Sequence, residues 1–340
     1  MPAPGEGKIS CQLTAGRLFQ TISSAYPLKI ISPKAIPNTP TSTEEEPSQK
    51  LQPAVSYILS YGGGIVHGDQ IHVDVNVGSG CALMLLTQGS TKIYKNRSGR
   101  PPSYLKNPRN DAKFDINQSY QTMIMDVAPG ALLCLLPDPV TCFKDALYNQ
   151  RQAVRLHDCS SSLVLLDWMT SGRMSRGERW DFAKYFSVNI VTLGYTPKSR
   201  GEQWMDGSKI LIRDALLLKQ PGDPSNIDQL DEPGSFARRL ENIDAFAFLL
   251  ILGPSVEQIS RMFVEEHKKY RIKAFRMSKT REDEEGVWWS VSEVDEQGVT
   301  GVAVRAAGPS TEVIREWIKR RLLPLQSVVG DSAWSMYFNA

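Results

Sequence analysis

The sequence predicts a mainly β protein. Stacked β-hairpin layers form a two-layer, β-solenoid-like body, and a smaller α-helical part follows late in the chain. Two observations carry this prediction: a hairpin pattern that recurs through the first half, and helical patterns that begin only after residue 254. The 340 residues are 41% hydrophobic and 22% charged, which suits a folded chain with a core. We expect a β-rich body over 8–220 and a helical part with returning strands over 221–330.

The first hairpin follows residue 70. Apolar residues alternate with polar ones from Ile71 to Val77, which is typical of a strand with one buried face. The sequence Gly78-Ser79-Gly80 then favours a turn. From Cys81 to Leu86 nearly every residue is apolar, as in a strand covered on both faces.

The same pattern recurs fifty positions further on, where Val127 takes the place of Val77. There Tyr120, Thr122 and Ile124 alternate with other residues, a turn ends at Gly130, and 131–136 is apolar. A third version leads into 163–166. The match aligns Gly80 with Gly130, Leu83 with Leu133, Leu85 with Leu135 and Leu86 with Leu136. A weak internal repeat of this kind predicts layers that cover one another, although unrelated hairpins in an ordinary β protein would also explain it.

Two amphipathic helices are predicted late in the chain. Ser255 would cap the first, over 255–267, with Gln258 as its capping-box partner. Thr311 would cap the second, over 311–323, and Pro324 would end it. A strand is expected over 298–306. The segments 33–53 and 96–111 lack hydrophobic periodicity and are expected to be flexible loops, and 221–234 is expected to be a linker.

Composition excludes several classes of protein. The net charge is only +2, which argues against a nucleic-acid partner. The longest apolar run, Ala245–Leu252, is far shorter than the ~20 residues of a membrane helix. No signal-like segment opens the chain, and the five cysteines are scattered. We therefore expect a cytoplasmic protein with reduced thiols and no membrane partner.

A glycine run stands out at Tyr61–Asp69 (YGGGIVHGD). No Lys-Ser/Thr pair follows it at P-loop spacing, so nucleotide binding is rejected. The glycines are expected to form a tight bend, with Asp69 at that bend and His67 on the same side of an extended chain.

Acidic and polar side chains also follow the predicted buried strands. Thr91 lies in the polar run Thr87–Lys92, Asp167 follows an apolar strand, and Glu178 lies in an Arg-rich and Gly-rich loop. Asp69, Asp167 and Glu178 fit either a general acid/base pair or weak oxygen sites for a divalent cation, and they fit structural ion pairs equally well.

A tight metal site and a serine hydrolase are not predicted. The histidines His67, His72, His157 and His267 show no metal-binding spacing, and neither Cys-x-x-Cys nor Gly-x-Ser-x-Gly occurs. A glycoside-acting enzyme that uses two of the carboxylates remains a further alternative.

Three motifs, in order, resemble the UreD (UreH) family of urease accessory proteins, over about 10–330. They are GGGIVHGD at 62–69, TQGSTKIY at 87–94 and GRMSRGERW at 172–180. His67 stands where the family usually has glycine, and the three loops look longer than in bacterial members.

The resemblance implies a non-enzymatic scaffold. Its partners would be the urease apoprotein, UreF and, through UreF, the GTPase UreG. Nickel would pass to urease through an internal path lined by Asp69, Thr91, Asp167 and Glu178, with His67 and His72 as weaker contributors. No cofactor would be tightly bound, because Ni²⁺ would only be in transit. The resemblance assigns no partner-binding residue, and a scaffold through which no metal passes is the alternative.

Overall fold

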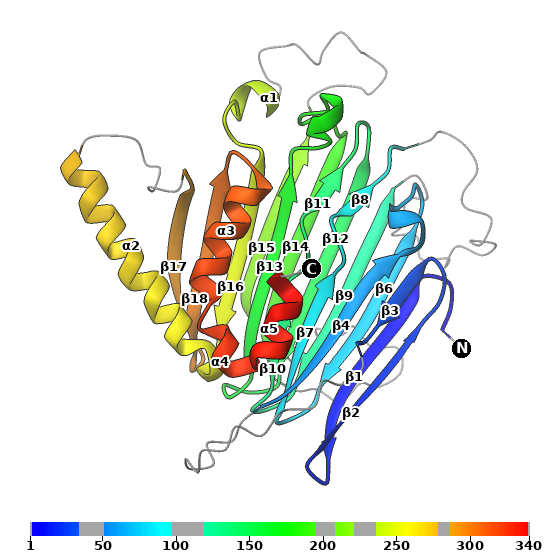
Figure 1. Ribbon diagram of the computed structural model, residues 1–340, viewed down its shortest axis with the longest axis vertical. Coiled ribbons are helices and arrows are strands. Elements are labelled where there is room, and N and C mark those ends of the chain that lie inside the picture. The colour runs from blue at the N-terminus through cyan, green and yellow to red at the C-terminus, as the bar shows by residue number, and fades with distance from the viewer. Residues whose placement is uncertain are drawn as a thin grey trace.

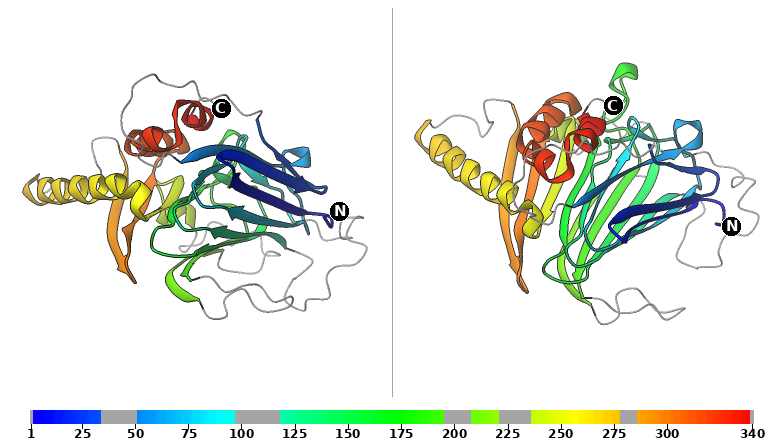
Figure 2. Two further views of the ribbon diagram at one scale, coloured as in Figure 1. Left: turned by 90° about the horizontal axis from the view of Figure 1, so that it is seen from below. Right: turned by 60° about the horizontal axis from the view of Figure 1, so that its bottom comes forward.

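The computed structural model describes residues 2–33, 51–96, 118–194, 208–220, 236–277 and 286–338. Two β-sheets lie face to face, and helices cover one of them (Figures 1 and 2). Sheet A contains, in spatial order, β15 (Lys209–Lys219), β14 (Lys184–Leu193), β12 (Leu147–Leu156), β9 (Ser119–Val127), β6 (Gln70–Val77), β1 (Glu6–Thr14) and β2 (Arg17–Ser24).

Sheet B is larger and less regular. Its main path runs β17 (Trp288–Glu296), β18 (Val299–Gly308), β16 (Ala245–Leu252), β13 (Ser162–Thr170), β10 (Leu132–Leu135), β7 (Cys81–Thr87), β4 (Gln52–Ser60) and β3 (Leu28–Ile31). Three short strands lie off this path: β5 (Gly64–Ile65), β8 (Thr91–Ile93) and β11 (Val140–Cys142).

The chain forms stacked layers by passing from sheet A to sheet B three times: from β6 to β7, from β9 to β10 and from β12 to β13. Equivalent strands pair in parallel. Val77 lies opposite Val127, and Leu83 lies opposite Leu133. These are the pairs that the internal repeat aligned, so the predicted β-solenoid-like body is confirmed.

The alternation in the second layer is confirmed, and the structure shows which half is buried. Met123, Met125 and Val127 point into the core, whereas Tyr120, Thr122 and Ile124 lie on the opposite face of β9. A partly exposed outer face can carry apolar residues too, so alternation alone did not decide which side was inside.

The helical part covers the outer face of sheet B. It comprises α2 (Glu257–Met277), α3 (Thr311–Leu322), α4 (Leu325–Val329) and α5 (Asp331–Phe338). Ile259, Phe263, Ile314, Trp317 and Ile318 pack there in one apolar cluster with strand residues such as Met84 and Leu166. Because β16 and β18 extend sheet B, the helical part and the body share one sheet. The structure also contains β17, α4 and α5, which the sequence analysis did not predict.

Both predicted helix caps were wrong. Before α2 the chain makes a short 3₁₀ turn, η4 (Pro254–Val256), and the Ser255 N–H donates to the Ser162 hydroxyl. At α3 the cap is Ser310, one residue earlier than predicted, and its hydroxyl accepts from the Val313 N–H at 3.3 Å. Thr311 is the first helical residue.

The predicted loops lie mostly outside the described residues. This applies to 34–50, to 97–111 and to the whole of 221–234, while Gln52 and Pro53 already belong to β4. None of the helices in the described ranges combines the length and apolar character needed to cross a membrane.

Candidate functional site

A cluster of buried polar side chains lies within the apolar core between the sheets. Inward side chains of β12 and β14 change character along the strands. Val154 lies opposite Val191, Gln152 opposite Asn189 and Gln150 opposite Ser187. Since these glutamine, serine and asparagine side chains are all buried, each must find a partner or lose the energy of its solvation.

Asp167 is the centre of this polar cluster. Its Oδ1 accepts from Gln150 Nε2 at 2.9 Å and from the Tyr185 hydroxyl at 3.4 Å. Its Oδ2 accepts from the Ser187 hydroxyl at 2.6 Å and from Asn189 Nδ2 at 2.8 Å. Burial raises the pKa of Asp167 above its ordinary value, although the hydrogen bonds from Ser187, Asn189 and Gln150 favour the ionised form.

Two carbonyl oxygens beside Asp167 are unused. Gln152 Oε1 and Asn189 Oδ1 are both buried and have no hydrogen-bond partner among the described residues. Their side chains are 3% and 1% exposed, respectively. The site therefore combines one carboxylate with two oxygens that can accept hydrogen bonds from water or contact a hydrated cation.

A small pocket, with a cavity volume of about 40 Å³ and partly open to solvent, lies at a break in sheet B. β10 ends at Leu135 and β11 begins at Val140, so that 166–168 of β13 pair only with β16. Asp167 stands at the middle of this gap. Leu135, from the inner core, and Trp168, from the cluster under the helices, both line the pocket. The pocket thus reaches both faces of the sheet.

Thr91 and Asp167 both line this pocket, together with Gln150 and Gln152. The other two residues of the expected path do not line it. Among the described residues, no group of three or more His, Cys, Asp or Glu side chains could hold a metal ion.

Asp69 lies in a tight turn beside the pocket. The Asp69 N–H donates to the Val66 carbonyl at 3.0 Å, and the Val66 N–H donates to Asp69 Oδ2 at 2.9 Å. Burial raises the pKa of Asp69 to about 6, which the Val66 N–H only partly offsets. The expected common side for His67 and Asp69 on an extended chain was wrong, because the chain turns between them: His67 is half-buried and Asp69 is buried. Ile65 and Ile71, on either side of the turn, do line the pocket.

Glu178 is held in an ion pair on the loop after β13. Arg173 Nε donates to its Oε2 at 2.8 Å, a second guanidinium nitrogen of Arg173 contacts Oε1, and the Lys144 N–H donates at 3.2 Å. The Arg173 hydrogen bond lowers the pKa of Glu178. His72, the other weak contributor, has its Nε2 3.2 Å from Asp74 Oδ1 and projects from the outer face of sheet A.

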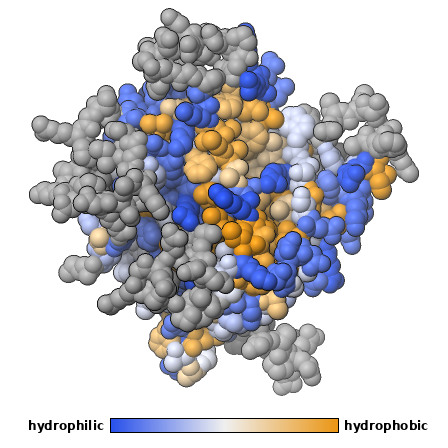
Figure 3. All heavy atoms as spheres, turned by 180° about the vertical axis from the view of Figure 1, so that it is seen from behind, coloured by the Kyte–Doolittle hydropathy of each residue, from blue (hydrophilic) through white to orange (hydrophobic). Residues whose placement is uncertain are grey.

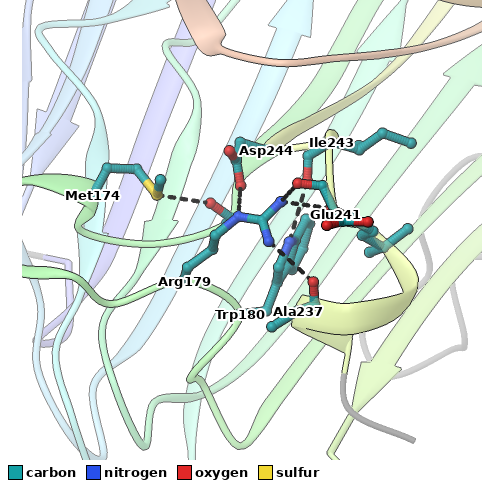
Figure 4. A network of polar contacts seen from close by, with 9 residues as sticks. Met174, Arg179, Trp180, Ala237, Glu241, Ile243 and Asp244 are labelled. Carbon is teal, nitrogen blue, oxygen red and sulfur yellow. Dashed lines mark hydrogen bonds and ion pairs between the residues drawn. The ribbon is translucent and has the colours of Figure 1, made fainter. Parts of the chain in front are cut away.

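The same loop contains a clamp that the sequence analysis did not predict (Figure 4). Arg179 Nε donates to Asp244 Oδ1 at 2.6 Å, and its other nitrogens reach the carbonyl oxygens of Ala237, Leu240 and Glu241. These residues lie in and after α1 (Phe236–Arg239) and lead into β16. Three arginines in one loop were a visible signal, but the contacts of Arg179 lie about 60 residues further along the chain.

The fold and the site define a stacked β protein whose apolar core contains a buried polar cluster beside a pocket in one sheet. The family model for the UreD urease accessory protein matches residues 6–336. The chain therefore belongs to the UreD family of urease accessory proteins, which confirms the resemblance and implies a role in urease maturation.

Full-length relatives agree with this assignment. The chain is similar to urease accessory protein 4 of Cryptococcus neoformans, with 31% identity over 97% of this chain and 94% of that protein. It is similar to urease accessory protein D of Arabidopsis thaliana, with 30% identity over 97% of this chain and 99% of that protein. The bacterial UreD of Sorangium cellulosum is 29% identical over 97% of this chain and 83% of its own length.

Proposed function

We propose that the chain is a non-enzymatic, cytoplasmic scaffold that binds the urease apoprotein together with UreF and, through UreF, the GTPase UreG. In this role it conducts Ni²⁺ to the urease active site past the buried polar cluster around Asp167. The ion is cargo, and no cofactor stays bound.

The observation that carries the proposal is the position of Asp167 at the break in sheet B, in a pocket that reaches both faces of that sheet. Ni²⁺ accepts oxygen ligands and water. One carboxylate with the neutral oxygen of Gln152, which lines the same pocket, binds such an ion weakly, and weak binding lets a cation leave again.

The other residues of the expected nickel path contribute in different ways. Thr91 offers a hydroxyl in the pocket. Asp69, in the adjoining turn, has a buried Oδ1 with no hydrogen-bond partner among the described residues. Glu178 becomes available to a cation only when its pair with Arg173 opens. His67 and His72 lie outside the pocket and serve at most as surface contacts for an arriving ion.

A scaffold without metal conduction is the second candidate. One observation favours it: Asp167 already accepts four hydrogen bonds, as a purely structural carboxylate would. The two candidates differ in what Asp167→Asn does. Nickel conduction requires the negative charge of Asp167, which this substitution removes. A scaffold requires only that the two sheets stay folded.

The test measures nickel in urease purified after co-expression with each variant and the other accessory proteins. We expect Asp167→Asn and Gln152→Leu to lower the nickel content severalfold while the complex still assembles. Thr91→Trp, which fills the pocket, should act in the same way. Gln326→Leu, on α4, is the control and should load urease normally. Normal loading by all three pocket variants would leave only the scaffold role.

A further inference from the structure

We propose that Arg315 of α3 controls cation entry at the outer mouth of the pocket in sheet B, which is formed by Thr87, Pro137 and Asp138. Its guanidinium group occupies the place on Asp138 that an entering cation takes. This inference rests on the nickel path proposed above and adds a residue that regulates entry to it.

The pocket has one carboxylate toward each face of sheet B. Asp138 lines it from the break between β10 and β11, and Asp167 lines it from β13. The Asp167 side chain bonds to residues of sheet A such as Gln150, so it points to the inner face. The Asp138 side chain pairs with Arg315 of α3, so it points to the outer face, which the helices cover. Asp138 is half-buried and Asp167 is buried, so the outer carboxylate is the one nearer to solvent.

The contacts of Asp138 bring several oxygens together at the mouth. The Asp138 N–H donates to the Thr87 hydroxyl at 2.7 Å, and Thr87 Oγ1 lies 3.5 Å from Asp138 Oδ2. Carboxylate and hydroxyl oxygens suit a divalent cation. Arg315 Nη2, however, lies 2.5 Å from Asp138 Oδ1. An approaching cation therefore meets a neutral ion pair in place of a free carboxylate.

Arg315 is also held from a second side. Its Cζ atom lies 5.3 Å from the centre of the Trp168 ring, and Trp168 Nε1 donates to the Pro137 carbonyl at 2.7 Å. Trp168 and Pro137 both line the pocket. A guanidinium group binds well to a carboxylate and to an aromatic face at once, so this arrangement places the positive charge of Arg315 at the entrance.

The pocket itself contains an oxygen that lacks a partner. Gln152 lines the pocket and is 3% exposed, and its Oε1 has no hydrogen-bond partner among the described residues. The cavity volume of about 40 Å³ gives room for about three water molecules. A divalent cation with its full shell of water needs more room, so it has to exchange water for protein oxygens as it enters. The oxygens of Asp138 and Thr87 are placed for this exchange.

Arg315 is able to leave Asp138. Its side chain is 34% exposed, so it can turn into solvent without leaving its own charge buried. Glu312 precedes it by three residues on α3, and residues at that spacing are neighbours on a helix surface. The pKa of Glu312 is lowered first by its own backbone N–H and by the Ser310 hydroxyl, and the charge of Arg315 contributes to the same shift. Glu312 can therefore receive the guanidinium group when a cation takes its place on Asp138.

The experiment measures the affinity of the full-length chain for Ni²⁺ by isothermal titration calorimetry at pH 7.5. The chain is fused to a soluble carrier protein without a polyhistidine tag, and the carrier alone is the blank. Arg315→Met and Arg315→Gln remove the charge, and the glutamine keeps a donor for Asp138. Arg315→Lys keeps the charge. Circular dichroism and melting temperature verify that each variant folds.

Two control variants remove an arginine charge elsewhere. Arg261→Met breaks an exposed ion pair with Glu257 on α2. Arg213→Met lies on β15 of sheet A. Figure 3 shows the molecule from the side of that sheet, where hydrophobic surface lies between hydrophilic side chains. Both controls have the same net charge as Arg315→Met, so a difference in affinity between them belongs to the mouth.

We expect Arg315→Met and Arg315→Gln to bind Ni²⁺ at least fivefold more tightly than the unaltered chain, because Asp138 becomes free. Arg315→Lys, Arg261→Met and Arg213→Met should stay within twofold of the unaltered chain. Adding Asp138→Asn to Arg315→Met should return the affinity to within twofold as well, because the freed carboxylate is then absent.

Three results would overturn the inference. One is an unchanged affinity in folded Arg315→Met and Arg315→Gln. Another is an equal gain in Arg261→Met or Arg213→Met, which would assign the effect to net charge. The third is a gain that persists when Asp138→Asn is added, which would place the binding site elsewhere.

The two proposals can fail separately. If the pocket variants Asp167→Asn, Gln152→Leu and Thr91→Trp load urease normally while Arg315→Met binds Ni²⁺ more tightly through Asp138, the mouth is a cation site and conduction is wrong. If those pocket variants block nickel loading while Arg315→Met keeps the affinity of the unaltered chain, conduction stands and the role of Arg315 is wrong.

Discussion

At the scale of single residues, Asp69 combines deep burial with an incompletely satisfied carboxylate. Burial raises its pKa from 3.8 to about 6 in the folded protein. The folded state therefore holds a proton that the unfolded chain releases between about pH 4 and pH 6. The free energy of unfolding should fall as the pH rises through this window and stay level above it, with a difference of about 3 kcal/mol for a shift of about two units.

Asp69→Asn removes this dependence, because an amide keeps an oxygen to accept from the Val66 N–H and carries no charge. We expect the variant to unfold at a higher urea concentration than the unaltered protein at pH 7.5, and at a similar one at pH 4. Asp145→Asn, at an exposed turn, serves as control. An unchanged urea midpoint at pH 7.5 would mean that ionisation of the buried carboxylate does not lower the free energy of unfolding.

The sequence predicted some site residues better than others. Asp167 was recognisable because a charge directly follows an apolar run. Gln150 and Gln152 gave no such signal. They lie on the same face of β12 as Val154 and Leu156, which are apolar and buried in the core. Only the pairing of β12 with β14 and the facing strand β13 reveals that these amides surround a carboxylate.

At the scale of elements, the loop after β13 holds the segment that leads from α1 into β16. Arg179 bonds to Asp244 and to carbonyl oxygens after and within α1, and the Ser171 N–H donates to the Asp244 carbonyl at 2.7 Å. The family motif at 172–180 therefore contains the Arg179 clamp, which is structural. Arg173 and Glu178 form a separate ion pair in the same motif. Hydrogen-bond donors of this kind cannot be assigned from spacing, because their acceptors are backbone atoms of a distant segment.

Arg179→Met should lower the free energy of unfolding by roughly 2 kcal/mol, because it leaves Asp244 and several carbonyl groups without their donor. Urea unfolding followed by circular dichroism measures the change. Arg176→Met, at an exposed residue of the same loop, should shift the unfolding free energy by less than about 0.5 kcal/mol. Equal effects of the two substitutions would exclude the clamp.

At the scale of the whole molecule, sheet B joins two cores. Leu133 points into the core between the sheets, and its neighbour Leu132 points into the core under the helices. The repeat in the sequence predicted the first core through its register. The helical stripes predicted that a second core exists, but not that β16 and β18 would attach it to the body.

Because the sheet is shared, Leu133→Ala and Leu132→Ala should each lower the stability of the entire molecule, by about 2–5 kcal/mol. Tryptophan fluorescence, which includes Trp289 and Trp317 in the helical cluster, should change at the same urea concentration as the far-ultraviolet circular dichroism. If Leu132→Ala unfolds the helical cluster at a lower concentration than the sheets, the two cores are independent.

The parallel register of the layers has a consequence for size. Each layer adds one strand to each sheet, so the body grows along its stacking axis only in whole steps of about 4.8 Å. A relative with one further repeat would be taller by a single rung, with its turns still aligned as Gly80 and Gly130 are. The length of the space between the sheets would then change only by whole repeats, through duplication of a unit, and point substitutions would leave it unchanged.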